Sequence, residues 1–554
     1  IAQSATLNVG TGIQSGNQTT LSLQADNDIY LSAAELNNAG SGTTLLQAGR
    51  QIDIGSIEMR RDHLQVWDND NQRHQISISQ QGSSIHAQGD IHIDGTNRIN
   101  IEASNIHSNS GHTALNSRNL AIESGREQDI YSDKFYSKNK DMLSSTQTRS
   151  HSAHQHDTAV AANISGKTIG IHAEQDIRIS GSHIVSEEST QLGAAGNINI
   201  TAAQNRMQNS LSTETQKSGL SGGIKSGVVS KGYSKSRQSL QHNADITRLS
   251  ESQIGSLKGN TTLAAAEQID TRATTLSAGN DLTLQAQSIH LGAAYARERD
   301  QIEAHSKQSG MSLGLNLKAP EVRQVEKRIE GIQNARRQDG ALKKWQAWDS
   351  GSIAANTEQF MPAIGFSATH SRSQSQEQQD YLRAIGSSAQ AGGTVRMQAG
   401  AGDLNIIGSR VFGEQGMQLA AAHDINIVAA EEQIDSSAQS SSKTNGLMGG
   451  GSAFSRFIGY RADASQETGS RIIHSSSIAG SGSGDSLIRA GRAYRQTGSD
   501  VYADGDIDIA AQSIDIAAAP NPYQSDYRNR FTQKGITVGV RSPLIQAVET
   551  AQEA

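Results

Sequence analysis

The chain lacks cysteine entirely, although it has 554 residues. Without thiols it has no disulfide scaffold, no thiolate metal site and no cysteine nucleophile. Proline is scarce as well, since five occur and none precedes Pro320. Because proline cannot donate a backbone hydrogen bond, this long proline-free stretch favours continuous strand pairing. No run of about 18 apolar residues exists, so the sequence predicts no membrane-spanning helix.

Aromatic residues make up 4% of the chain, too few for an ordinary globular core. Apolar residues still reach 35% and the net charge is −7, a balance that does not favour simple disorder. The mildly acidic composition has no overall basic footprint, so we predict no nucleic-acid partner. Residue 1 is Ile and lies within the repeat pattern described below, with no signal peptide before it. We expect the chain to be part of a longer protein.

What the chain does contain is one short stretch that recurs. Residues 281–294 read DLTLQAQSIHLGAA, and residues 506–519 repeat this as DIDIAAQSIDIAAA. Alternation at period two places each apolar pair on one face of an extended strand. One short strand cannot bury that face, whereas a stack of similar strands can, as in a solenoid. Looser copies lie at 28–34, 90–95, 176–181, 197–203, 403–408 and 424–430.

The copies recur at a regular step. Asp176 and Asn197 are separated by 21 residues, as are Ile101 and Ile122, and we predict that this step is one turn of the solenoid. A larger repeat is also present, since residues 176–203 align with residues 403–430 at an offset of 227.

These repeats divide the chain into three predicted parts. Residues 1–125 carry β-helical repeats, residues 126–385 form a module with polar inserts, and residues 386–554 form its second copy. Polar stretches at 124–160, 204–245 and 431–471 are predicted to be protruding hairpins or loose loops. Pro320 opens a helical pattern within an insert at about 320–348, and Pro543 opens a shorter one that is truncated at residue 554.

The repeats have the form A-G-x-[DN]-[IL]-x-[IL]-x-[AG], and G-S-x-[IV] and G-x-T-x-L segments link them. The polar stretches end in related signals: 217–220 (KSGL), 308–311 (QSGM), 444–447 (TNGL) and 533–536 (QKGI). This combination resembles the filamentous haemagglutinin family, and in particular the downstream repeat region of CdiA-type contact-dependent inhibition effectors. The resemblance covers nearly the whole chain.

The resemblance implies an all-β fold, a right-handed parallel β-helix with hairpin or loop inserts and one or two short helices. It also implies a protein secreted through an outer-membrane two-partner transporter to the outer surface of a Gram-negative bacterium. The expected function is cell contact and, in a contact-dependent inhibition setting, delivery of a C-terminal toxin across the target outer membrane. The expected partners are the outer membrane or a receptor of the target cell and a toxin domain in the same polypeptide. The family's amino-terminal secretion domain and its pretoxin segment are absent from this sequence.

Two other functions stay open at this point. One is a passive haemagglutinin-type adhesin or spacer, and the other is a β-helical polysaccharide lyase or hydrolase. Asp62, Asp68 and Asp70 near Trp67 resemble the paired carboxylates of a glycosidase beside a sugar-stacking ring. Acidic residues are scattered along every coil, however, so we expect a solvated loop there and predict that the chain is not an enzyme.

Three further motifs have a chemical interpretation beside a structural one. Residues 161–168 (AANISGKT) resemble a relaxed phosphate-binding loop, but strand-like alternation follows where a helix is needed, and Gly393 of the second copy corresponds to Lys167. His151, His154 and His156 are dense enough for a metal, but their spacing does not place all three on one strand face. Residues 482–487 resemble a single calcium-binding nonapeptide. We expect a coil corner, a polar loop and a Gly-rich turn, and assign no catalytic, cofactor or metal residue.

The predicted helix at 321–337 is amphipathic. Its apolar stripe could lie on a membrane surface or pack against the solenoid, and the sequence favours packing because acidic residues dilute the charge. The cationic residues opposite the stripe are Arg323, Lys327, Arg328, Arg336 and Arg337.

Overall fold

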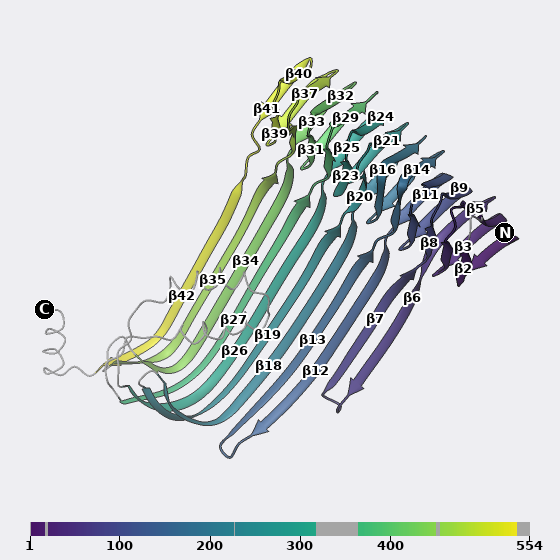
Figure 1. Cartoon of the computed structure of the whole chain (residues 1–554). Coiled ribbons are helices and arrows are strands. Elements are labelled where there is room, and N and C mark those ends of the chain that lie inside the picture. The colour runs from purple at the N-terminus through teal and green to yellow at the C-terminus, as the bar shows by residue number, and fades with distance from the viewer. Residues whose placement is uncertain (1, 17–19, 226–227, 317–363, 450–454, 540–554) are drawn as a thin grey trace.

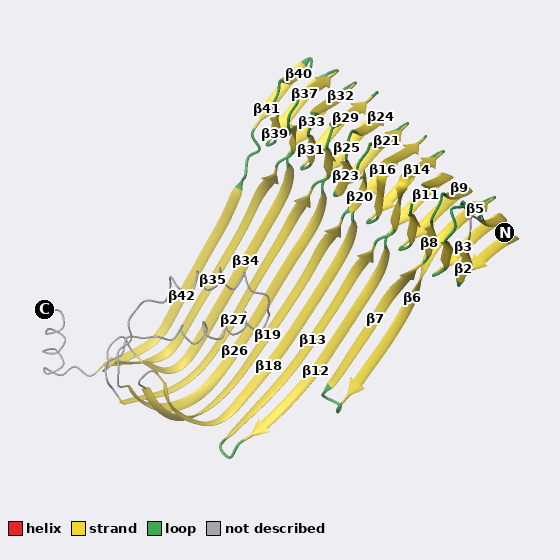
Figure 2. Ribbon diagram, in the orientation of Figure 1, coloured by secondary structure: helices red, strands yellow, loops and turns green. Residues whose placement is uncertain are grey.

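The computed structural model of the chain contains two systems of strands (Figure 1). The structure describes residues 2–16, 20–225, 228–316, 364–449 and 455–539. Strands account for all the regular structure in these ranges, and no helix occurs within them (Figure 2). The predicted helices at about 320–348 and 544–554 lie outside the described residues. The predicted all-β class is confirmed.

The first system is a parallel solenoid whose coils have three strands each. β20 (Ser252–Ser256), β21 (Thr261–Ala265) and β22 (Gln268–Arg272) form one coil. Each strand of this coil pairs in parallel with one strand of the next: β23 (Thr274–Ala278), β24 (Leu282–Ala286) and β25 (Ser288–Gly292). The strands therefore stack into three parallel faces, as predicted for a β-helix.

The remaining solenoid strands continue these faces. The first face also contains β2 (Gly12–Ser15), β4 (Glu35–Asn38), β8 (Ser84–Ala87), β10 (Asn105–Ser108), β28 (Ser388–Ala391), β31 (Arg410–Gly413), β36 (Ile478–Ser481) and β39 (Asp500–Tyr502). The second contains β5 (Thr44–Ala48), β29 (Thr394–Ala399), β32 (Gly416–Ala421), β37 (Ser486–Ala490) and β40 (Ile507–Ala510). The third contains β15 (Ile177–Ser180), β17 (Ile198–Thr201), β30 (Leu404–Ile407), β33 (Ile425–Val428), β38 (Ala493–Thr497) and β41 (Ser513–Ala517). Strands that continue around a corner are β1 (Ala2–Val9), β3 (Leu21–Ser32), β9 (Ile91–Glu102), β11 (His112–Glu123), β14 (Asn163–Ala173) and β16 (His183–Ala194).

The register confirms the predicted step of the solenoid. Ile101 lies opposite Ile122 and Ile177 lies opposite Ile198, so partners in adjacent coils are 21 residues apart. Alternate side chains point inward and stack as columns of Ile, Leu and Val. The side chains of these partners are fully buried: Ile101, Ile122, Ile177 and Ile198. Each fully buried side chain of this kind contributes about 1.5–3 kcal/mol. The thin core explains how the fold forms with so few aromatic residues.

The corner between the third and first faces carries a ladder of buried serines. The backbone N–H of Ser387 donates to Ser409 Oγ (3.0 Å), that of Ser409 to Ser477 Oγ (3.1 Å), and that of Ser477 to Ser499 Oγ (3.2 Å). Each hydroxyl thus satisfies a backbone donor of a neighbouring coil that would otherwise be buried without a partner. This ladder gives the G-S segments of the sequence a structural role.

The residue before some of these serines adopts a left-handed conformation and is tightly packed. Gly408 has φ of +56°, and a Cβ placed on it would lie 2.4 Å from Ala430 Cβ. At another copy of this corner the pair is reversed: Ala103 has φ of +48°, and the facing residue is Gly125. At both corners, one member of the facing pair is glycine.

The Asp or Asn of the repeat forms a second ladder. Asp176 Oδ1 accepts a hydrogen bond from the Asn197 backbone N–H (2.8 Å), and Asp485 Oδ1 accepts one from the Asp506 N–H (2.9 Å). The glycine before this position allows the contact, because a Cβ on Gly196 would lie 2.5 Å from Asp176 Oδ1. The carboxylate therefore bonds to the backbone of the next coil.

The second system is one antiparallel sheet of long hairpins, which we call the hairpin sheet. Its strands lie side by side along the solenoid (Figure 1). In spatial order they are β6 (Gln51–Val66), β7 (Gln72–Gly82), β12 (Gly125–Lys140), β13 (Ser144–Val160), β18 (Ala203–Lys225), β19 (Val228–Ser250), β26 (Ala294–Asn316), β27 (Ile364–Ile385), β34 (Ala430–Gly449), β35 (Ser455–Ser475) and β42 (Tyr523–Gly539). The first residues of β6 belong to the third solenoid face.

From β6 onward a hairpin leaves the corner between the third and first faces after every second coil. Two coils separate β19 from β26, and two coils separate β27 from β34. Paired strands are about 4.8 Å apart, so two coils occupy the same length of the axis as the two strands of a hairpin. This match lets consecutive hairpins pair edge to edge, and it turns the predicted polar inserts into one sheet.

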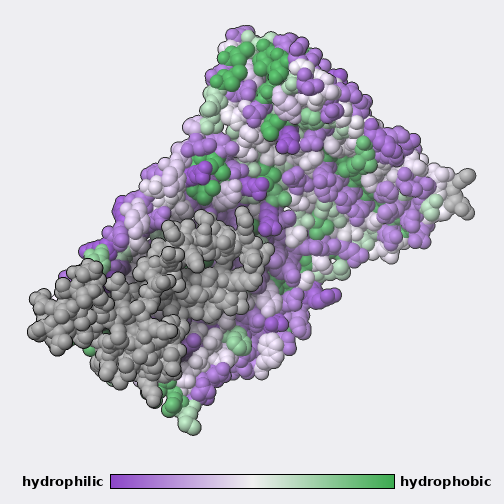
Figure 3. Space-filling view, turned by 60° about the vertical axis from the view of Figure 1, so that its left-hand side comes forward, coloured by the Kyte–Doolittle hydropathy of each residue, from purple (hydrophilic) through white to green (hydrophobic). Residues whose placement is uncertain are grey.

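One end of the solenoid exposes residues of the inward-facing pattern. Ile507, Ile514 and Ile516 on β40 and β41 are 46%, 51% and 62% exposed. Figure 3 shows a hydrophobic patch at the top of the molecule, the end at which β40 and β41 lie in Figure 1. The rest of the solenoid surface in that view is mostly hydrophilic.

Candidate functional site: the hairpin sheet

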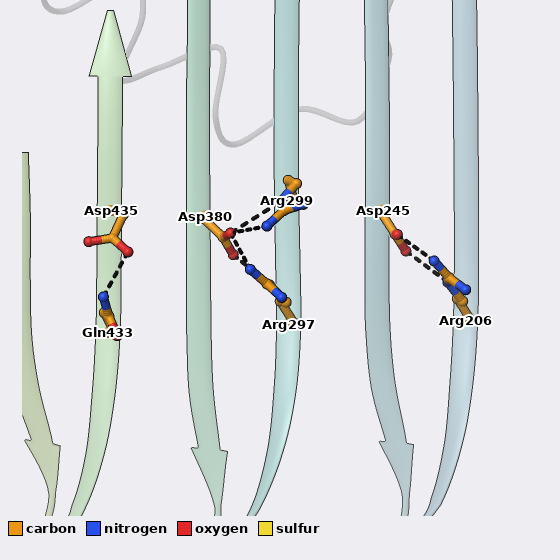
Figure 4. Close-up of polar contacts among 7 residues, drawn as sticks. All are labelled: Arg206, Asp245, Arg297, Arg299, Asp380, Gln433 and Asp435. Carbon is orange, nitrogen blue, oxygen red and sulfur yellow. Dashed lines mark hydrogen bonds and ion pairs between the residues drawn. The ribbon is translucent and has the colours of Figure 1, made fainter. Parts of the chain in front are cut away.

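Charge at the roots of the hairpins is compensated within the sheet (Figure 4). Arg206 on β18 forms a bidentate ion pair with Asp245 on β19, at 3.1 and 2.7 Å. On the next hairpin Asp380 accepts hydrogen bonds from both Arg297 (2.8 and 2.6 Å) and Arg299 (3.1 and 2.8 Å). These arginine contacts hold the pKa values of Asp245 and Asp380 below the usual range. These ion pairs therefore fix the register of the long strands and make Asp245 and Asp380 unsuited to acid catalysis.

The root of the following hairpin uses neutral partners. Asp435 Oδ2 accepts a hydrogen bond from Gln433 Nε2 (2.8 Å) (Figure 4). Its Oδ1 accepts one from Ser470 Oγ (2.7 Å). Nearby, the buried Glu432 accepts a hydrogen bond from the Tyr381 hydroxyl (2.9 Å). Burial and this carboxylate raise the pKa of Tyr381.

Farther from the solenoid, the K-S-G-L-like signals align across the sheet. Leu220 lies opposite Tyr233, which lies opposite Met311, and the row continues strand by strand to Ile536. Directly opposed residues of an antiparallel pair share a face, so these side chains form one line, which we call the apolar row. Its members are Leu220, Tyr233, Met311, Ala368, Leu447, Ile458 and Ile536. Leu220, Tyr233, Met311, Ile458 and Ile536 are each more than half exposed.

Glycines occupy the adjacent position on the other face. Gly219, Gly310, Gly446 and Gly535 precede the apolar residues of the four signals, and a Cβ on any of them would lie within 2.7 Å of a backbone oxygen of the neighbouring strand or, for Gly219, of the turn beside it. Phe457 covers one of these glycines, Gly535, and the facing Gly459, since its ring would lie 2.7 and 2.8 Å from a Cβ on each. The signals therefore specify a close approach of strands beneath the apolar row.

A shallow hollow lies beside the apolar row. Its volume is about 390 Å³. Its lining residues come from the neighbouring strands β19, β26, β27 and β34, and are Tyr233, Ser309, Gly310, Met311, Ala368, Thr369, His370, Asn445 and Gly446. The sequence indicated the signals but not this hollow, because the hollow forms only when four strands pair, and the sequence of one strand does not specify that pairing.

The structure separates the candidate carboxylates. Asp62 on β6 bonds to His74 (2.7 Å), whereas Asp68 lies in the hairpin turn and accepts the backbone N–H groups of Asp70 and Asn71 (2.8 Å each). The His74 contact lowers the pKa of Asp62, and the Asn71 contacts lower that of Asp68. A general acid needs a raised pKa, so these carboxylates lack the electrostatics of a glycosidase pair.

The other sequence candidates have structural roles. Residues 163–173 form strand β14, and Lys167 stands at a coil corner where it pairs with Glu188 (3.3 Å). His151 and His154 differ by an odd number of positions on β13 and face opposite sides, and His154 bonds to Asn209 (2.9 Å). Across the described ranges, no group of three His, Cys, Asp or Glu side chains could hold a metal ion.

The remaining candidates lie in a turn and outside the described residues. Residues 482–487 include a corner where Ser483 Oγ donates to the Glu414 carbonyl (2.7 Å). The predicted amphipathic helix at 321–337 lies outside the described residues. None of the described segments is a helix long and apolar enough to cross a membrane.

Fold and surface together define a repeat-built scaffold, a parallel β-helix that displays a second sheet of hairpins. The family model of the hemagglutinin repeat matches residues 143–247, 229–331 and 366–483, just over half of the chain. The chain belongs to this family. Each match begins in, or one residue before, a strand of the hairpin sheet and includes the two coils that follow it, so the family repeat coincides with the structural unit.

Curated relatives are CdiA proteins. The chain is 25% identical over 398 residues to "Toxin CdiA" of Yersinia pestis, which covers 69% of the chain and 12% of that protein. It is 26% identical over 391 residues to "Deoxyribonuclease CdiA" of Yersinia pseudotuberculosis, covering 66% and 36%. A "tRNA nuclease CdiA-2" of Burkholderia pseudomallei is 31% identical over 150 residues, covering 27% and 5%. The chain thus spans a small part of these relatives. No solved structure matches.

These matches indicate a CdiA-type secreted, surface-exposed exoprotein. The hemagglutinin-repeat region is a structural segment of such a protein. The nuclease names describe whole relatives of which this chain matches only a part.

Proposed function

We propose that this chain is the part of a bacterial surface exoprotein that mediates cell contact and takes part in delivering a C-terminal toxin across the target outer membrane. The observation that carries this proposal is the hairpin sheet, a continuous exposed surface attached to a rigid solenoid in a family whose curated relatives are CdiA toxins. Loops and inserts on a rigid scaffold are the usual carriers of recognition.

The proposal includes partners that lie outside this chain. An outer-membrane two-partner transporter exports the protein to the Gram-negative cell surface, and a toxin domain follows in the same polypeptide. The absence of cysteine suits export in an unfolded state, because no thiol needs protection. The target cell's outer membrane, or a receptor in it, is the contact partner.

The structure suggests a sharp test in the full-length exoprotein. One variant deletes residues 203–292, a whole unit of one hairpin and two coils, so that β17 leads into the hairpin β26–β27 and the coil pattern is kept. The other variant replaces residues 206–247 and 433–472 with short turns, which leaves the solenoid intact and shortens two hairpins. Surface display is matched, and attachment and toxin delivery are scored separately.

We expect the first variant to retain attachment and delivery, although its solenoid is two coils shorter. We expect the second variant to lose delivery. Loss of attachment alongside delivery in the second variant would favour the passive adhesin as the main role. If the second variant kept both activities, the hairpin sheet would be a replaceable spacer and the proposed function would fail.

A further inference from the structure

A row of cations crosses the hairpin sheet on the same face as the apolar row. Arg237, Lys307, Arg372 and Lys443 lie on the neighbouring strands β19, β26, β27 and β34, and each is directly opposite the next. All four side chains are exposed. Since paired strands are about 4.8 Å apart, the four positions span roughly 14 Å. We call this set the basic row.

Like charges placed directly opposite one another destabilise a sheet, so this row has an energetic cost. Arg237 offsets part of it through Glu214 (2.8 Å). The other three cations form no ion pair with any residue in the described ranges. This differs from the hairpin roots, where Arg206, Arg297 and Arg299 all have aspartate partners. Because the repulsion among these cations is not compensated within the described residues, it indicates an anionic binding partner.

The surroundings of the basic row strengthen this interpretation. Three further cations, Lys140, Lys235 and Lys534, lie in the row between it and the apolar row, together with His370. No acidic residue occupies the apolar row, the basic row or the row between them. The chain as a whole has a net charge of −7, so this acid-free band is a local concentration of positive charge.

The hollow beside the apolar row supplies a different chemistry. Tyr233 and Met311 are 54% and 59% exposed and present flat or flexible apolar surface. Ser309, His370 and Asn445 line the same hollow with hydroxyl, imidazole and amide groups. Aromatic surface beside hydrogen-bonding groups fits a sugar ring, which has apolar faces and a polar rim.

We propose that this face of the hairpin sheet binds a linear anionic saccharide chain. The chain would lie across the strands, with its carboxylate, sulfate or phosphate groups on the basic row and its rings against Tyr233 and the hollow. The rows run parallel to the solenoid axis because each hairpin contributes the same positions, so the surface matches an extended polymer. The inference rests on the proposed contact function and names the chemistry that the sheet would contact on another cell.

A lipid bilayer fits this surface less well. The apolar side chains form a single line, and the next positions on the same face include Ser309, Asn445 and Lys235. Groups of this kind lack hydrogen-bond partners in hydrocarbon. A hydrated polyanion can contact the apolar row and the basic row and leave the polar side chains between them in contact with water.

The test measures binding of the 554-residue chain to heparin, a linear sulfated polysaccharide, with neutral dextran and phosphatidylglycerol vesicles measured in parallel. The row variant combines Lys307→Gln, Arg372→Gln and Lys443→Gln. The control variant combines Arg61→Gln, Lys217→Gln and Arg471→Gln, which removes the same charge at exposed positions on the opposite face of the hairpin sheet. A third variant, Tyr233→Ser, keeps every charge.

We expect the row variant to bind heparin about tenfold more weakly and the control variant to change by less than about twofold. The row variant should unfold at or above the temperature of the unmodified chain, because like-charge repulsion is removed. Tyr233→Ser should weaken the binding that persists at high salt, where screening removes most of the electrostatic part.

Three outcomes would overturn the inference: equal heparin binding by the row and control variants, no binding to heparin at low salt, or row-dependent binding to vesicles alone. These solution measurements are independent of toxin delivery. Heparin binding that depends on the row, in a protein whose hairpins prove dispensable for delivery, would leave the saccharide site standing while the proposed function failed.

Discussion

Exchanging the two residues of a corner pair should reveal how the solenoid packs. Gly408 is left-handed, with φ of +56°, and its α-carbon faces Ala430 in the hairpin that follows. Gly408→Ala adds a methyl group whose carbon would lie 2.4 Å from Ala430 Cβ. The left-handed conformation costs about 1–2 kcal/mol for a non-glycine residue, and overpacking costs about 1–3 kcal/mol. We therefore expect a loss of about 2–5 kcal/mol.

The second substitution in the cycle is Ala430→Gly. Alone it removes a buried methyl group and adds backbone freedom, which together cost about 1–2 kcal/mol. In the double variant the clash is gone, so only the conformational terms remain. The pair Ala103 and Gly125 shows that the fold accommodates this reversed arrangement. We expect a favourable coupling of at least about 1 kcal/mol.

The measurement must be local, because a repeat protein opens in parts. Hydrogen exchange of the Ser409 amide serves this purpose, since that N–H donates to Ser477 Oγ (3.1 Å) directly beside the substituted corner. Exchange under native conditions is compared among the parent, both single variants and the double variant. Strictly additive effects would refute the packing argument, because they would mean that the two residues do not compete for the same space.

Three other predictions concern the ladder, the charges and the spacing of hairpins. Ser409→Ala leaves the Ser387 N–H without its 3.0 Å partner and should cost about 1–3 kcal/mol in urea denaturation, whereas Ser409→Thr, which keeps the hydroxyl, should cost less. Arg297 lowers the pKa of Asp380, so the stability that this carboxylate contributes is present above its unfolded pKa of about 3.9 and is lost as the pH falls through its lower folded pKa. Asp380→Asn should therefore flatten that part of an acid-unfolding curve, and an unchanged curve would contradict this role of Asp380. Deleting residues 252–273, a single coil, should lower the temperature at which the β-sheet circular dichroism signal is lost, because only one coil then separates two hairpins and one coil matches one strand of a hairpin, not two. Deleting residues 203–292 should not have this effect. Equal thermal stability of the two deletions would contradict the match between two coils and one hairpin.

The solenoid could be predicted closely from the sequence, because its signal is local and repeated. The alternation in residues 281–294 gives the strand faces, and the 21-residue step gives the register that the pairs Ile101–Ile122 and Ile177–Ile198 show. Each coil buries its own apolar pairs in the same way, so one copy is informative about all of them.

The hairpin sheet could be predicted only in part. Residues 204–245 have few apolar anchors, and their polarity is compatible with a loop as well as with a hairpin. What makes them strands is pairing with neighbouring hairpins, and that pairing depends on the two-coil spacing of the solenoid beneath. The basic row was missed for the same reason, since Lys307 and Arg372 are 65 positions apart in the chain but opposite each other in the sheet.

The alignment of the hairpins has a consequence for how such a surface gains strength. A residue type placed once per hairpin is reproduced as a line across the sheet, so its effect is multiplied by the number of units. A partner that is itself a repeating polymer meets each added unit as a tethered second site, and its avidity rises without any new kind of contact. The number of hairpins then sets how firmly the protein holds, and single contacts can stay weak and reversible while the whole attachment is durable.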